Sequence, residues 1–125
     1  MFQTKTDIVV KGALDGLAAR HKAFVRNIAN AETPGYQPSD VRFEDQLKRV
    51  RDGLDGRGIG ILPSPDLRLV ETPEDQSADR PDDNGVQIDS QIVRLEENTM
   101  TYEALSQATA IRGEMLRSAI NEGRR

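Results

Sequence analysis

The chain of 125 residues contains no cysteine and no tryptophan, and its only histidine is His21. The lack of cysteine excludes disulfide bonds, thiolate nucleophiles and zinc sites with thiolate ligands. Aromatic residues make up only 4% of the chain, which is a thin supply for a self-sufficient globular core. The length and composition therefore predict one domain at most.

Long apolar runs are also lacking. No stretch approaches the roughly 20 apolar residues of a membrane-spanning helix, so we expect no membrane-spanning segment. The first apolar run, Ile8 to Val10, is too short for a secretory signal peptide. The net charge of −4 comes without a basic stripe and interleaved aromatics, so nucleic-acid binding is not indicated. Composition alone favours a cytosolic chain.

No combination of residues that would carry catalysis is found. His21 has no cysteine or second histidine beside it, so we interpret it as a packing or interfacial residue. The glycine-rich segment 53–60 lacks both the Gly-Lys-Ser/Thr ending of a P-loop and the Rossmann spacing. Residues 82–85 fail as a calcium loop, because Arg80 and Gln91 would occupy positions that need acids. We expect no enzyme activity, no small-molecule substrate, no cofactor and no metal.

The six prolines all lie between Pro34 and Pro81. The chain therefore divides into an N-terminal helical arm (1–33), an irregular insertion (34–88) and a C-terminal helical arm (89–125).

Charge is unevenly distributed along the chain. Residues 1–31 carry five basic and two acidic side chains, whereas residues 32–85 carry seven basic and thirteen acidic ones. This asymmetry predicts either complementary surfaces between neighbouring subunits or an ordinary solvated charge face.

The N-terminal arm repeats mostly apolar residues at alternating intervals of four and three. A period of 3.5 residues is typical of a helix that packs one stripe against another helix. A second stripe of small or slim residues, from Val9 through Ala13 and Gly16 to Ala23, lets another backbone approach. We therefore expect this helix to have neighbours on more than one side. The first stripe consists of Val10, Leu14, Leu17, His21, Phe24, Ile28 and Ala31.

The C-terminal arm has a similar pattern and begins near Asp89 or Ser90, either of which suits an N-cap. A helix of about 30 residues would be roughly 45 Å long. We expect a mainly α fold in which the two long terminal helices pair as an antiparallel, coiled-coil-like hairpin. The predicted assembly seam comprises Val10, Leu14, Leu17, Phe24 and Ile28 in the first arm, and Ile92, Leu95, Tyr102, Leu105 and Met115 in the second.

The insertion has weaker patterns. A short helix is predicted from Asp40 to Arg51, with Gly53 just after its end. Short strands are predicted at 59–62 and 67–70. We expect residues 71–85, which are rich in acids, to form a solvent-facing loop.

Residues 27–37, the corner segment, read Asn-Ile-Ala-Asn-Ala-Glu-Thr-Pro-Gly-Tyr-Gln. Pro34 cannot continue a helix and restricts Thr33, and Gly35 suits the left-handed position of a type II turn that ends at Tyr36. Asn27 and Asn30 either cap open carbonyls at the helix end or lie exposed. The sequence therefore predicts a sharp corner after the first helix.

The corner segment resembles the N-terminal signature of the bacterial flagellar axial proteins, the rod and hook family. Residues 38–47, 86–89, 97–98, 100–105 and 115–120 also resemble segments of the short members that form the proximal rod. Arg26, Glu32 and Gln37 depart mildly from the family pattern. The resemblance covers both arms, about two thirds of the chain.

This resemblance implies a structural subunit of the proximal rod that polymerises into a helical tube, links the membrane (MS) ring to the distal rod and transmits torque. The implied partners are copies of itself, other rod proteins, the rod-base adaptor, the MS ring and the export gate. The implied location is the periplasmic rod of the basal body, reached through the flagellar type III export apparatus without a cleaved signal. The alternatives are a sister rod protein and an autonomous helical binding module such as a chaperone.

The free energy gained by burying one apolar stripe is partly cancelled by the entropy cost of ordering both arms. We therefore expect the isolated monomer to be frayed.

Overall fold

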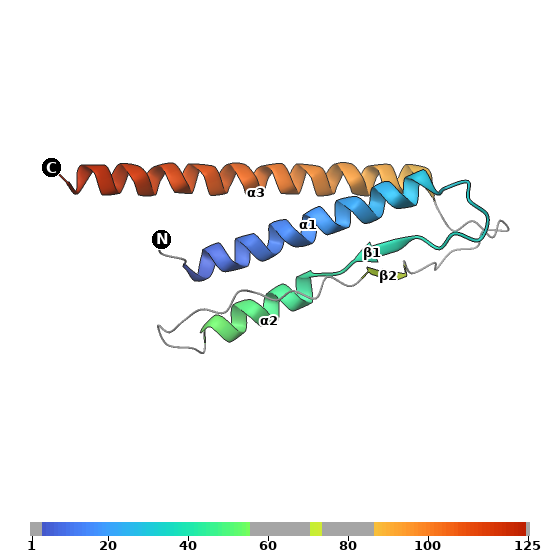
Figure 1. Cartoon of the computed structure of the whole chain (residues 1–125), viewed down its shortest axis with the longest axis horizontal. Helices are drawn as coiled ribbons and strands as arrows, with labels where there is room; N and C mark the ends of the chain where they lie inside the picture. Colours follow the sequence, from blue (N-terminus) through green and yellow to red (C-terminus); the bar gives the residue numbers. More distant parts are fainter. Residues whose placement is uncertain (1–3, 56–70, 74–86, 125) are drawn as a thin grey trace.

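The computed structural model describes residues 4–55, 71–73 and 87–124. Helices α1 and α3 lie side by side and antiparallel, and β1 and α2 lie on the other side of α1 (Figure 1). The predicted hairpin of terminal helices is confirmed, and so are neighbours of α1 on more than one side. The elements in chain order are α1 (Lys5–Ala29), β1 (Ser39–Val41), α2 (Glu44–Asp55), β2 (Glu71–Pro73) and α3 (Ile88–Glu122).

Both ends of α1 are capped by side chains. Thr4 and Asp7 form a capping box: the Thr4 backbone N–H donates to Asp7 Oδ2 at 2.8 Å, and the Asp7 N–H donates to Thr4 Oγ1 at 3.2 Å. Hydrogen bonds from Thr4, with help from the Arg112 charge, lower the pKa of Asp7. At the other end, Asn30 Nδ2 donates to the Arg26 carbonyl at 2.8 Å, so the predicted cap by Asn30 is confirmed.

The corner segment turns the chain back along α1. The Tyr36 N–H donates to the Thr33 carbonyl at 3.2 Å, which closes the predicted turn. Gly35 has φ 73°, a conformation that side chains with a Cβ rarely adopt. The geometry that the Pro34-Gly35 pair predicts is therefore confirmed, and β1 follows directly from it.

Two boundaries in the insertion differ from the predictions. Helix α2 begins at Glu44 rather than Asp40, because Ser39–Val41 pair antiparallel with Glu71–Pro73. The backbone groups of β1 thus face a partner strand and are not available for the hydrogen bonds of a helix. Gly53 lies inside α2 rather than after it.

Residues 71–73 form β2, so the predicted loop was wrong there. Residues 74–85 and the strands predicted at 59–62 and 67–70 lie outside the described residues. Helix α3 begins at Ile88 with Gln87 as its N-cap residue, which makes no side-chain capping bond. Asp89 and Ser90 therefore lie in the first turn of α3 rather than before it.

The hydrophobic core lies mainly between α1 and the segment that forms β1 and the start of α2. Leu17, Ala23, Val41 and Phe43 are buried together. The small residue Gly16 makes this packing possible, because a Cβ at this position would overlap the Phe43 ring. The stripe of small residues on α1 thus accommodates an aromatic ring. Three partly buried residues pack around the cluster: Ala19, Leu47 and Leu105.

We predict that Gly16→Ala lowers the free energy of unfolding by about 1–3 kcal/mol, because the extra methyl displaces the Phe43 ring from a packed core. Gly53→Ala is the matched control: Gly53 also lies within a helix, but nothing lies within 4 Å of its would-be Cβ. There the change should be neutral or stabilising by up to about 1 kcal/mol. Urea unfolding followed by circular dichroism measures the free energy of unfolding of both variants. Equal changes would contradict the close packing of Gly16 against the Phe43 ring.

Candidate assembly surface

Asn27 joins four segments through one fully buried side chain. Its Nδ2 donates to the Ser39 carbonyl at 2.8 Å and to Gln91 Oε1 at 3.0 Å. Its Oδ1 accepts from the Ser39 N–H at 3.0 Å and from the Tyr36 hydroxyl at 3.2 Å. These four bonds, the Asn27 node, connect α1, the turn, β1 and α3. The prediction that Asn27 caps a helix carbonyl or lies exposed was therefore wrong.

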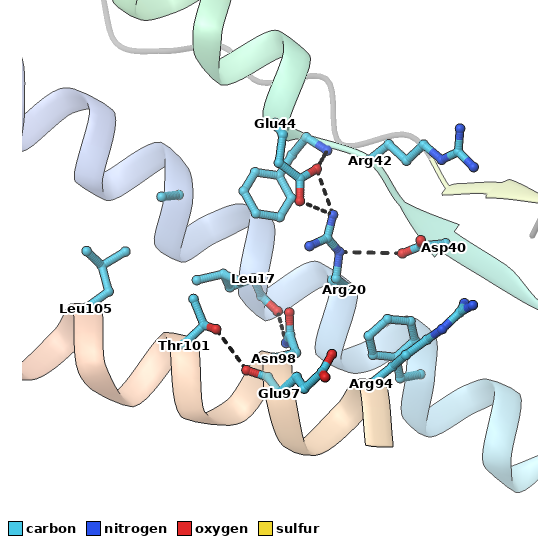
Figure 2. Close-up of a pocket in the computed structure, with 13 residues that line it drawn as sticks. Leu17, Arg20, Asp40, Arg42, Glu44, Arg94, Glu97, Asn98, Thr101 and Leu105 are labelled. Atoms are coloured by element: carbon cyan, nitrogen blue, oxygen red, sulfur yellow. Dashed lines mark hydrogen bonds and ion pairs between the residues drawn. The ribbon is translucent and has the colours of Figure 1, made fainter. Parts of the chain in front are cut away.

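Arg20 makes a second connection, between α1 and the insertion (Figure 2). Its guanidinium donates to the Val41 carbonyl at 2.9 and 2.7 Å and pairs with Glu44 at 2.6 Å and Asp40 at 3.4 Å. It also lies 4.5 Å from the centre of the Phe43 ring, a cation–π distance.

Basic residues of the first arm thus meet acids of the insertion within one chain. Lys5 and Asp55 form a further pair at 3.6 Å. Part of the charge asymmetry therefore serves contacts inside the subunit.

The contact between α1 and α3 is largely polar. Gln91 and Asn98 are the buried residues of α3; Asn98 Nδ2 donates to the Leu17 carbonyl at 2.9 Å. Arg112 reaches Thr4 Oγ1 at 3.1 Å and Asp7 at 3.3 Å. Together with Leu105, these residues recur every seven positions, which is the repeat of a helix seam.

The predicted seam residues fall into three groups. Leu17 and Phe24 are buried, whereas Ile92, Tyr102 and Met115 are exposed. The latter three are not buried in the hairpin, because the polar repeat lies between the helices instead. Their role in assembly stays a prediction. His21 is exposed and does not pack inside the chain, so its interfacial role stays a prediction as well. The partly buried group is Val10, Leu14, Ile28, Leu95 and Leu105.

The turn residues are distributed more simply. Tyr36 is partly buried beside Asn27, and Asn30 is partly buried at the end of α1. Thr33, Pro34 and Gly35 are exposed.

Helix α3 carries exposed apolar side chains from its first turn to its last. Its last ten residues, Gly113–Glu122, continue beyond the start of α1 and are all exposed (Figure 1). We call this segment the overhang. Large exposed apolar patches are typical of protein–protein interaction sites. The exposed large apolar residues of α3 are Ile88, Ile92, Val93, Met100, Tyr102, Ile111, Met115, Leu116 and Ile120.

A groove of about 630 Å³ lies where α1, the β1–α2 segment and α3 meet (Figure 2). Asn98 is 6% exposed at its floor, and its Oδ1 has no hydrogen-bond partner among the described residues. Arg42 and Glu97 belong to its rim. The other lining residues are Ala13, Leu17, Arg20, Phe24, Asp40, Phe43, Glu44, Arg94, Thr101 and Leu105.

These features define a class: a helical-hairpin protein whose two long helices meet largely through polar contacts and whose C-terminal helix leaves apolar side chains exposed. Within the described ranges, no helix has the length and hydropathy needed to cross a bilayer. No cluster of three potential metal ligands occurs there either.

Comparison with known proteins identifies the family. The chain is 32% identical over 105 residues to the flagellar basal body rod protein FlgB of Yersinia enterocolitica, covering 73% of this chain and 75% of the relative. The FlgB protein of Escherichia coli K12 is 31% identical over 103 residues, with the same coverage. That of Borreliella burgdorferi is 27% identical over 110 residues, or 78% of this chain and 82% of the relative. The chain belongs to the FlgB family of flagellar basal body rod proteins. No protein-family model matches it.

Sequence reasoning missed three residues that join α1 to the insertion or to α3: Arg20, Gln91 and Asn98. The spacing of seven between Gln91 and Asn98, continuing to Leu105 and Arg112, was the available signal. It was obscured because an apolar stripe on the same helix has a similar period.

We predict that Asn27→Asp lowers the free energy of unfolding by about 3 kcal/mol, because it removes both buried donors of the Asn27 node. The control is Asn30→Asp, which removes one donor at the partly buried end of α1 and should cost about 1 kcal/mol. Urea unfolding of the full-length chain at pH 7 compares them. Equal losses would show that the node does not hold the corner.

A second prediction concerns how the stability of the fold changes at acidic pH. Burial raises the pKa of Glu44, but hydrogen bonds from Arg20 and the Phe43 N–H outweigh this and lower it below its ordinary value of 4.5. A lowered folded pKa gives stability that is present above pH 4.5 and is lost as the pH falls through the folded value.

We therefore expect Glu44→Gln to unfold at a lower urea concentration than wild type at pH 7, and the difference to shrink towards pH 3. Unfolding midpoints at several pH values measure it. A gap that stays constant with pH would exclude the Arg20–Glu44 pair as its origin.

Proposed function

We propose that this chain is a structural subunit of the proximal rod of the flagellar basal body. Its copies and other rod proteins assemble into a helical tube that links the membrane (MS) ring to the distal rod and transmits torque. The rod-base adaptor and the export gate are further partners at its base. The chain reaches the periplasmic rod through the flagellar type III export apparatus.

The observation that carries this proposal is the exposed apolar surface of α3. Val93, Met100, Ile111 and Met115 are each more than half exposed. Their spacings of seven, eleven and four residues place them on one side of the helix, away from the polar stripe that contacts α1. A lone chain leaves this surface in water, whereas a crowded tube buries it.

The polar contacts inside the subunit suit the same role. The Asn27 node and Arg20 fix the corner and the insertion to the helices, so a load applied to one arm reaches the other. Contacts that are repeated head to tail, without closing into a ring, generate a helical polymer.

Membership of the FlgB family decides against the sister rod protein FlgC. The other alternative, a self-sufficient binding module or chaperone, predicts a monomer that melts cooperatively with high helix content. Circular dichroism of dilute chain separates the two classes. We expect partial helix content and a broad transition.

The decisive experiment is complementation in the source bacterium after deletion of the gene for this chain. We predict that Met100→Asp abolishes swimming and leaves the chain out of purified basal bodies, because a charge enters the apolar surface. Asn121→Asp adds the same charge on the polar face of α3 and should swim normally. Normal swimming of Met100→Asp, or a motile deletion strain, would refute the proposed role.

A further inference from the structure

We propose that the overhang of one subunit packs into the groove of a second copy of this chain. This contact rests on the proposed function and specifies how two copies meet. Three observations carry it: an unsatisfied buried acceptor in the groove, an apolar line on the overhang, and matching lengths and charges.

The groove is incomplete within one subunit. Asn98 Oδ1 is buried at its floor with no hydrogen-bond partner among the described residues, although the Nδ2 of the same amide is bonded to the Leu17 carbonyl. An unpaired buried acceptor costs free energy until a donor arrives. The apolar side chains of Leu17, Phe24 and Leu105 line the same groove. Its occupant therefore offers apolar side chains with one donor beside them.

The overhang has this composition. The line of α3 that faces α1 runs through Leu105 and Arg112 and continues at intervals of four and three to Leu116 and Ala119. Leu116 is 52% exposed and Ile120 60% exposed, because this part of α3 extends beyond the first residues of α1. The stripe that is polar inside the hairpin thus becomes apolar where no partner within the described chain covers it. The guanidinium of Arg117, three residues before Ile120 and therefore beside it on the helix surface, can donate to an acceptor.

Length and charge also agree. The groove extends along α3 from Arg94 to Leu105, which is about 17 Å, and the overhang from Gly113 to Glu122 is about 14 Å long. The rim carries Arg42 and Glu97, of opposite sign. The overhang carries charges of both signs as well, from Glu114, Arg117 and Glu122.

A second copy suits the groove because the contact is heterologous. Overhang and groove are different surfaces of one subunit, and each subunit has one of each. A subunit with a filled groove still presents its own overhang, so the contact can repeat from copy to copy, and it builds a helical polymer when its rotation does not close a ring.

Cysteine cross-linking tests the contact directly, because the chain has no cysteine of its own. The full-length chain carrying Thr101→Cys and Ala119→Cys is purified and oxidised with oxidised glutathione. The two positions lie about 27 Å apart on one straight helix, which is beyond the reach of a disulfide, so a bond between them joins two molecules. We expect a ladder of dimers, trimers and larger species on a non-reducing gel.

The matched control pairs Thr101→Cys with Asn121→Cys, on the other side of the overhang. This control should give about tenfold less cross-linked dimer than the first pair. Adding Leu116→Asp to the chain with Thr101→Cys and Ala119→Cys should lower its yield by the same factor. A first pair that stays monomeric, or that cross-links no better than its control, overturns the proposal.

Mixing of two blocked variants provides a second measurement. Leu116→Asp disables the overhang but leaves the groove, and Thr101→Arg fills the groove but leaves the overhang. Each alone should sediment as a monomer, and an equal mixture should form a dimer and nothing larger. A mixture that stays monomeric, or either variant forming long chains alone, contradicts the contact.

The test also separates this contact from the proposed function. Basal bodies purified from cells carrying the Thr101 and Ala119 cysteine pair are oxidised in the same way. If the chain is present in the rod and the cells swim, but no link forms, the overhang–groove contact is wrong and the rod function stands. If the wild-type chain is missing from basal bodies, both are wrong.

Discussion

The rest of the structure depends on the buried amide of Asn27. Its two donors and its carbonyl oxygen are all bonded, to Ser39, Gln91 and Tyr36, which belong to three separate segments. Because a buried amide loses free energy for every bond left unmade, the turn, β1 and α3 must take up these positions together. The hairpin angle and the path of the insertion follow from this one side chain.

The polar contacts between α1 and α3 explain why so much of the apolar surface of α3 is exposed. Where α3 meets α1, Gln91, Asn98 and Arg112 make directional bonds that fix the register of the helices. The buried core cluster comes from α1 and the insertion, since Gly16 lets the Phe43 ring pack directly against the helix backbone, and α3 adds the partly buried Leu105. Most of the large apolar side chains of α3 are therefore left exposed.

Much of this could be predicted from the sequence because it depends on local rules. The stop at Pro34-Gly35, the two helical arms and the signature of the flagellar axial family are visible in consecutive residues. The start of α2 was misplaced because β1 pairs with residues 71–73, some thirty positions away. The polar stripe of α3 was missed because the apolar and polar stripes share nearly one period, and periodicity alone does not say which stripe faces α1.

The sequence by itself determined that the ends of the chain are helices, that the first ends in a sharp left-handed glycine turn, and which family the chain belongs to. Backbone sterics and side-chain spacing act over a few residues, so these features need no knowledge of the fold. Only the tertiary structure decided that Asn27 is a buried junction, that Arg20 holds the insertion and that α3 turns its apolar side outward. Those outcomes depend on bonds between groups 9 to 81 residues apart, whose partners become known only when the chain is folded.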